Sequence, residues 1–116
     1  MNTCEHAVSV KEPCQQCELF YLHHTEGRSV DNVIANIEAI GLIRGWDLRE
    51  LYLVAPFGFC NVAYRHCKDA RMEKHGGRNV VIVPAVSGDI TIHLGTSGKT
   101  IFVMRQGDAI DQLEWY

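Results

Sequence analysis

Residues 79–105 read NVVIVPAVSGDITIHLGTSGKTIFVMR, and they carry the clearest secondary-structure pattern in the chain. Three runs rich in valine, isoleucine, threonine and phenylalanine are separated there by short turns of serine and glycine. Runs of β-branched and aromatic residues bounded by such turns are typical of strands in hairpins. We therefore predict strands at 79–86, 89–94 and 100–105, joined as a three-stranded antiparallel meander.

The residues before this stretch predict two main helices. Ser29 is followed by apolar residues at spacings of three, one, three and three, which mark one face of a helix over 30–40 that stops at Gly41. A second, amphipathic helix is predicted from residue 59 or 61 to about residue 74.

Two shorter segments complete the predicted fold. Residues 50–54 favour a buried strand, and Asp47 with Glu50 also fits the capping box of a short helix. Asp108 is expected to cap a final turn that runs to Leu113. Helices followed by a run of strands predict the α+β fold class.

The chain has 116 residues, which is the size of one domain, with an N-terminal segment at 1–24 and an α+β core at 25–116. Its 47% hydrophobic content excludes disorder. No apolar run reaches the length of about eighteen residues that a membrane-spanning helix needs. The first twenty residues lack the apolar core of a secretion signal, so we expect a cytoplasmic protein with reduced cysteines.

Three cysteines and one histidine gather in the polar N-terminal segment. Cys4, His6, Cys14 and Cys17 form the pattern Cys-x-His-x7-Cys-x2-Cys. A Cys3His set suits one tetrahedral structural zinc ion, and a Cys-x2-Cys pair on a tight turn directs both sulfurs at one metal. The segment has few other apolar groups to bury, so we expect metal binding to supply the free energy that orders it.

The pattern over 4–17 resembles the small zinc knuckles of many short bacterial and phage proteins. This resemblance implies four zinc ligands and no function. In an alternative ligand set, His23 or His24 replaces His6. The compact build and the knuckle are also similar, by analogy alone, to accessory proteins of phages or mobile elements.

A second group of thiols and imidazoles lies on the predicted second helix. Cys60 and Cys67 are seven residues apart, so they stack on one side of a helix, where we expect them to be core residues. One alternative is a thiol enzyme in which Cys67 is the nucleophile beside His66. A zinc-dependent hydrolase would instead use His66, His75 or His93, and a second metal site could combine both cysteines with a histidine.

The stretch 65–78 is basic within a chain whose net charge is −3. Five cations less two carboxylates give this stretch a local charge of +3. Such a face can attract nucleic acid or an acidic protein surface. The five cations of this predicted anion-binding or partner-binding face are Arg65, Lys68, Arg71, Lys74 and Arg78.

These patterns favour a non-enzymatic binding or regulatory module. The small size, the closed ligand set and the lack of a paired acid and base point away from an enzyme. We expect structural zinc as the cofactor and a protein as the main partner. Nucleic-acid binding through 65–78 is the alternative partner class, and no membrane partner is expected.

Overall fold

The computed structural model describes residue 9 and residues 11–86, 88–95, 100–105 and 108–114. In these ranges the helices are α1 (Gln15–Thr25), α2 (Val30–Arg44), the short 3-10 helix η1 (Leu48–Glu50) and α3 (Phe57–His66). The strands are β1 (Tyr52–Ala55), β2 (Arg71–His75), β3 (Arg78–Ala85), β4 (Gly88–Leu94), β5 (Thr100–Arg105) and β6 (Asp108–Glu114). The predicted α+β class is confirmed.

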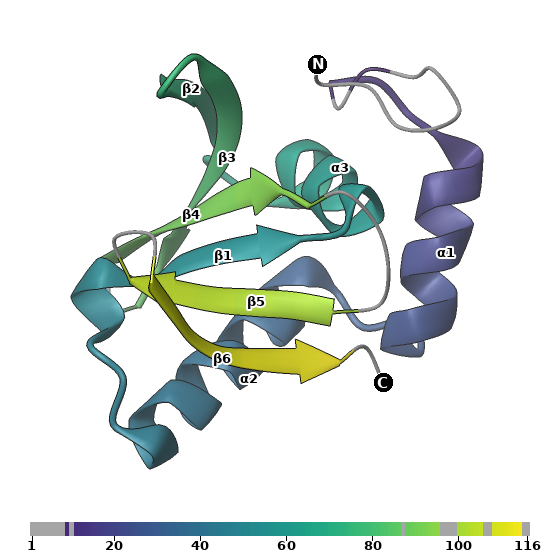
Figure 1. Ribbon diagram of the computed structural model, residues 1–116. Helices are drawn as coiled ribbons and strands as arrows, with labels where there is room; N and C mark the ends of the chain where they lie inside the picture. The colour runs from purple at the N-terminus through teal and green to yellow at the C-terminus, as the bar shows by residue number, and fades with distance from the viewer. Residues whose placement is uncertain (1–8, 10, 87, 96–99, 106–107, 115–116) are drawn as a thin grey trace.

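The strands form one six-stranded sheet in the order β2-β3-β4-β1-β5-β6 (Figure 1). β1 lies parallel to β4 and antiparallel to β5, and all other neighbours pair antiparallel. The three strands predicted at 79–105 exist, and β3 and β4 form a hairpin. The predicted meander is nevertheless wrong, because β1 lies between β4 and β5.

The position of β1 is explained by its apolar inner side. Leu53 is in register with Ile92 on β4 and with Val103 on β5, and all three side chains are fully buried. Alternate residues of a strand point to one face of the sheet. Phe59 of α3 and Ile37 of α2 pack into the same cluster, and both helices lie behind the sheet in Figure 1. A strand in the middle of the sheet therefore buries these residues more completely than an edge strand would.

Helix α2 begins as the sequence predicts and ends one turn later. The Ser29 hydroxyl accepts a hydrogen bond from the Asn32 N–H, which caps the helix. Gly41, the predicted stop, lies inside the helix, and a Cβ there would come within 2.6 Å of Leu48 and 2.8 Å of Trp46. The helix ends at Gly45, whose φ of 75° is left-handed. Gly41 is thus required for packing rather than for termination.

The predicted helix from residue 59 or 61 to 74 is wrong in its second half. α3 ends at His66, Asp69 has a positive φ of 63°, and the chain returns as β2. Gly76 and Gly77 then turn into β3 with φ values of 60° and 82°. The charged side chains of β2 suit an edge strand, because charge there opposes pairing with another chain. The charge spacing of this stretch therefore fits a helix surface and an edge strand equally well.

Two smaller predictions have different outcomes. β1 confirms the strand predicted at 50–54, and the alternative short helix also exists as η1, where the Asp47 carboxylate accepts from the Arg49 N–H. The final turn expected from Asp108 to Leu113 is instead strand β6, which pairs with β5 and packs Ile110 against the core. No helix in the described ranges is long and apolar enough to cross a membrane.

Candidate metal centre

Cys14 and Cys17 lie in the first turn of α1. Cys14 is the N-cap residue with extended backbone, and Cys17 lies inside the helix. The two side chains form a small buried cluster on which Phe57 packs, and neither sulfur forms a disulfide bond. The tight turn predicted at 14–17 is therefore a helical turn, which brings residues three apart onto one side.

The other two predicted ligands, Cys4 and His6, lie outside the described residues. Within the described part of the chain, no group of three or more His, Cys, Asp or Glu side chains gathers where it could hold a metal ion. The structure thus describes Cys14 and Cys17, one half of the predicted ligand set.

The first turn of helix α3 packs against Cys14 and Cys17 of α1. Phe57, in this turn, packs against the cluster that the two cysteines form. At Gly58 the two helices approach so closely that a Cβ would lie 2.8 Å from the carbonyl oxygen of Cys17. The close contact between the two helices therefore requires a glycine at this position. The contact also sets where Cys17 lies along the axis of α3.

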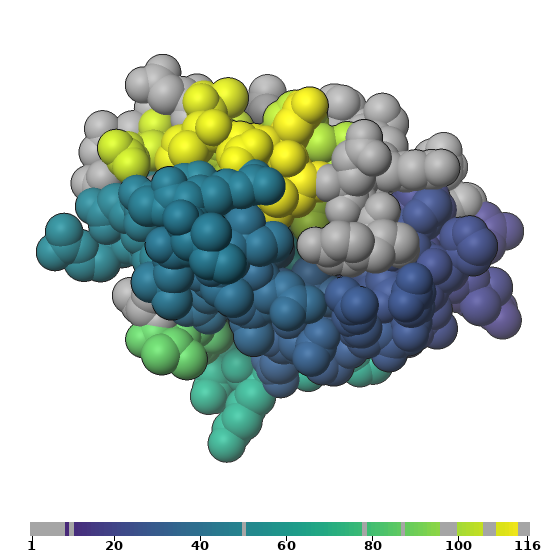
Figure 2. All heavy atoms as spheres, turned by 90° about the horizontal axis from the view of Figure 1, so that it is seen from below, coloured from purple at the N-terminus to yellow at the C-terminus, as the bar shows by residue number. Residues whose placement is uncertain are grey.

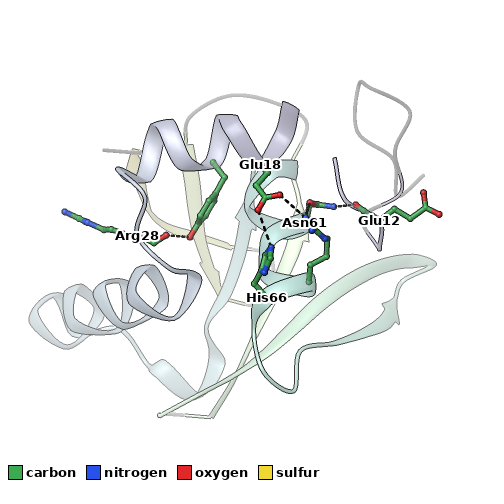
Figure 3. A network of polar contacts seen from close by, with 7 residues as sticks. Glu12, Glu18, Arg28, Asn61 and His66 are labelled. Atoms are coloured by element: carbon green, nitrogen blue, oxygen red, sulfur yellow. Dashed lines mark hydrogen bonds and ion pairs between the residues drawn. The ribbon is translucent and has the colours of Figure 1, made fainter. Parts of the chain in front are cut away.

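Polar contacts from α3 hold the chain on both sides of the thiol pair (Figure 3). Asn61 is fully buried and donates from its amide to the Glu12 carbonyl, just before Cys14, at 2.7 Å. Arg65 donates to the Glu18 carboxylate, just after Cys17, at 3.3 Å and to the Asn61 side chain at 3.4 Å. His66 Nε2 lies 3.4 Å from the other Glu18 oxygen. The backbone of the Cys-x2-Cys turn is thus held before and after its sulfurs.

Helix α1 does not separate apolar from polar residues as most surface helices do. Its inner side carries Cys14, Cys17, Tyr21 and Thr25, of which Tyr21 belongs to the main core. Its exposed side carries Leu19, Phe20 and Leu22 beside the polar residues Gln15, Gln16 and His23.

Tyr21 is the largest side chain on the inner side of α1. It is 1% exposed, and burial raises the pKa of its phenol to about 12. Its hydroxyl donates to the Arg28 carbonyl at 2.9 Å, and Thr25 donates to the Tyr21 carbonyl at 2.7 Å. These contacts fix the lower end of α1 against the start of α2, so the helix is held at both ends.

Comparisons of the chain with protein-family models, curated proteins and solved structures found no significant match. The chemistry of the site is therefore inferred from its own residues: two buried thiols, a glycine that the helix contact requires, and polar contacts on either side.

The alternative ligands His23 and His24 lie at the other end of α1. Nine residues of helix place His23 about 13 Å along the axis from Cys14. The His24 ring packs on Phe20, with 4.2 Å between the ring centroids, and His23 is exposed. This placement argues against a tetrahedral site that combines either histidine with both cysteines.

Cys60 and Cys67 are buried, as the core interpretation predicts. The Cys60 sulfur lies 3.7 Å from the Ala55 carbonyl oxygen, and burial raises the pKa of this thiol. Cys67 donates to the Asp31 carboxylate at 3.3 Å, and burial together with this carboxylate raises its pKa to about 11. A nucleophilic thiol needs the opposite shift. His66 pairs with Glu18, so the structure shows no thiol–imidazole pair on α3.

The five basic residues of the predicted anion-binding or partner-binding face are distributed over three elements and the segment between two of them. Arg65 lies on α3, Lys68 follows it, Arg71 and Lys74 lie on β2, and the backbone of Arg78 begins β3. Arg71 is 2.7 Å from both Glu73 and Asp89, and Arg65 binds Glu18. A single basic helix face therefore does not form, and carboxylates accompany two of its cations.

Sequence reasoning missed Asn61 and Glu18. A sequence signal for Asn61 does exist, because it is an amide within the otherwise apolar first half of α3. Its partner is a backbone carbonyl 49 residues away, and backbone carbonyls carry no sequence signal.

Proposed function

We propose that this chain is a small zinc-stabilised binding module that acts through a protein partner. Cys4, His6, Cys14 and Cys17 would hold one structural zinc ion, and the metal would fix α1 on α3. The outer side of α1 would then be the surface presented to the partner. An accessory role in a phage or mobile element stays a prediction.

The small apolar burial of α1 beside its two inward thiols is the observation that carries this proposal. Burial of Tyr21 and two thiols gives little apolar free energy compared with the entropy of ordering eleven helical residues. Structural zinc contributes about 10–16 kcal/mol in small zinc-finger peptides, which is enough to fix such a segment. A helix that buries so few apolar side chains of its own is thus well explained by metal ligands on its inner side.

The charge of α1 favours a protein over a nucleic acid as the partner. The helix contains no lysine or arginine, and its one carboxylate, Glu18, turns inward to Arg65. Nucleic-acid surfaces depend on cations, whereas the centres of protein interfaces are depleted of charge and enriched in large apolar groups. Leu19, Phe20 and Leu22 supply groups of that kind.

Metal analysis tests the zinc site. Protein purified without added zinc is expected to contain one zinc ion per chain, and Cys14→Ser or Cys17→Ser is expected to lose it. Cys67→Ala is the matched control, since this buried cysteine lies outside the proposed ligand set, and it should keep the metal. Wild-type protein without zinc, or a Cys14→Ser, Cys17→Ser double variant with full zinc content, would overturn the assignment.

Cross-linking in extract of the native host tests the partner surface. A specific partner is expected to be captured by the wild type, lost with Leu22→Glu and lost after zinc chelation. Val86→Glu places the same charge at a fully exposed aliphatic residue away from α1 and should retain the partner. Capture that Leu22→Glu leaves unchanged would contradict a role for the outer side of α1.

A further inference from the structure

Cys14 and Cys17 occupy two positions at the start of α1 whose side chains lie close together. Cys14 is the N-cap residue, with extended backbone at φ −118° and ψ 103°, and Cys17 is the third residue inside the helix. These are the two positions whose side chains reach toward each other in a capping box. Both side chains lie in one buried cluster. The start of α1 therefore brings two thiols together.

The backbone around this pair of thiols is already ordered. The Glu18 N–H donates to the Cys14 carbonyl at 2.9 Å, which closes the first turn of the helix. Asn61 holds the chain just before the turn, and Arg65 holds Glu18 just after it. A covalent bond between the two sulfurs would close a very short loop in a segment that is already fixed, so it costs little further conformational entropy.

The pair of thiols lies outside the main core. All four described cysteines are at most 9% exposed, so access to any of them depends on local opening. Cys60 and Cys67 belong to the main core, whereas the cluster of Cys14 and Cys17 has only Phe57 packed against it in the described chain. Figure 2 views the molecule from below, and it agrees with Figure 1 in placing α1, in purple, at one edge. Such an edge opens at a lower cost in free energy than the core does, so a small solute reaches this pair first.

Cys60 and Cys67 are poorly suited to oxidation and cannot pair with each other. Cys60 lies inside α3 and Cys67 caps its end, so about 10 Å of helix axis separates them. A disulfide joins Cα atoms that are at most about 7 Å apart. Peroxides oxidise thiolates, but burial raises the pKa of both thiols, and the Asp31 carboxylate contributes at Cys67. Oxidation should therefore be selective for the pair on α1.

We propose that Cys14 and Cys17 are a reversible oxidation site, at which hydrogen peroxide converts the two thiols into a disulfide. One sulfur, as its thiolate, attacks a peroxide oxygen; the O–O bond breaks, and a sulfenic acid and a hydroxide ion form, the latter taking up a proton to become water. The other thiol then attacks the sulfenic sulfur, the S–S bond forms, and the oxygen leaves as a second water molecule. Two thiols are oxidised, one peroxide is reduced, and exchange with a dithiol reverses the reaction.

The disulfide would also control the metal, and this part of the inference rests on the proposed zinc site. The same two sulfurs cannot bind zinc while they are joined to each other. Oxidation would remove two of the four proposed ligands, and a tetrahedral structural site needs all four. The chain would therefore release its zinc in the presence of peroxide and bind it again after reduction.

Thiol counting and peptide mapping of the full chain test the disulfide. Hydrogen peroxide, added in equimolar amount to protein freed of metal by chelation, should remove two of the five thiols, as alkylation in denaturant measures. Peptide mapping should find Cys14 joined to Cys17, and dithiothreitol should restore every thiol. No loss of thiols, or a disulfide that joins other cysteines, would overturn the proposal. The mapping uses the wild type, so it does not depend on whether a cysteine variant folds.

Variants supply the controls. The Cys14→Ala, Cys17→Ala double variant should keep all its thiols, whereas Cys67→Ala should lose two, as the wild type does. Loss of thiols in the double variant would overturn the proposal.

Zinc content separates this inference from the proposed function. In the zinc-loaded wild type, oxidation should release all the bound zinc, as a colorimetric chelator measures. Oxidised protein that keeps its zinc would overturn the link between the disulfide and the metal. Protein that forms the disulfide but contains no zinc when purified would contradict the zinc site and leave the oxidation site supported.

Discussion

The buried amide of Asn61 donates to the backbone carbonyl of Glu12 at 2.7 Å, and this contact joins α3 to the segment that leads into the Cys-x2-Cys turn. The Asn61 side chain is the buried partner, and a buried amide needs such an acceptor. Asn61 also accepts from Arg65, which in turn holds Glu18 on the far side of the turn. One asparagine thus connects both sides of the candidate metal centre.

Replacing Asn61 by alanine should destabilise the protein by about 0.5–1.5 kcal/mol, because the partly buried hydrogen bond to the Glu12 carbonyl is lost. Denaturant unfolding of the zinc-loaded protein measures this loss. Asn32→Ala, on the exposed side of α2, is the control and should change stability by less than about 0.5 kcal/mol. If both variants changed the free energy of unfolding equally, the hydrogen bond from Asn61 to Glu12 would make no contribution to stability.

Replacing Gly58 by alanine should destabilise the protein, by about 1–3 kcal/mol, through contact of the new methyl group with the Cys17 carbonyl. Helix propensity alone predicts the opposite sign, since alanine is favoured over glycine by about 1 kcal/mol inside a helix. The sign of the change in unfolding free energy therefore shows whether steric contact with the Cys17 carbonyl or helix propensity has the larger effect. A stabilised variant would mean that α1 and α3 do not approach closely at this point.

The pair formed by Arg65 and Glu18 should show measurable coupling in a double-mutant cycle of alanine variants. The Arg65 side chain is 20% exposed, so we expect about 0.5–1 kcal/mol, decreasing with added salt. Arg49 and Asp47 form the comparison pair, because the Arg49 side chain is 85% exposed. Coupling in that pair should be close to zero, and equal coupling in both pairs would contradict the role of burial.

Stability should decrease in alkaline solution through Cys67. The folded state raises the pKa of this thiol to about 11, so the folded state retains the proton more strongly than the unfolded state does. The contribution is complete below the unfolded thiol pKa of about 8.5 and is lost as pH rises toward 11. Between pH 8 and pH 10.5, the wild type should lose about 2 kcal/mol more than Cys67→Ala. Parallel pH profiles would contradict the shifted pKa.

Removal of zinc should loosen α1 before it affects the sheet. Amide hydrogen exchange is expected to accelerate at Cys17 and Tyr21 after chelation under reducing conditions. Leu53, in the centre of the sheet, should keep its protection, because local opening affects the elements with the least apolar burial first. Uniform acceleration would indicate that the metal stabilises the whole domain, and no acceleration would contradict a zinc site at this end of α1.

Much of the local structure could be predicted from the sequence. The apolar spacing after Ser29 predicts α2, and the β-branched runs predict β3, β4 and β5, because side-chain periodicity reflects which face an element buries. The Cys-x2-Cys spacing likewise identified a pair of thiols that the structure places side by side. Each of these signals lies within about fifteen residues of chain.

The boundary between α3 and β2 could not be predicted in the same way. The charged residues of this segment, Arg71, Glu73 and Lys74, are compatible with a helix surface. The segment is a strand because β2 pairs with β3. β6 is a similar case, because its residues show little apolar alternation and gain their conformation from β5. Strand formation of this kind depends on a partner strand.

The sequence by itself determined the apolar face and the start of α2, the burial of Cys60 and Cys67, and the thiol pair at 14–17, since these follow from local periodicity and spacing. Only the tertiary structure decided that β1 enters between β4 and β5, that Asn61 reaches Glu12, and that α1 packs with its leucines outward. These features join residues far apart in the chain. Their free energy comes from surfaces that meet only after folding, so no local pattern records them.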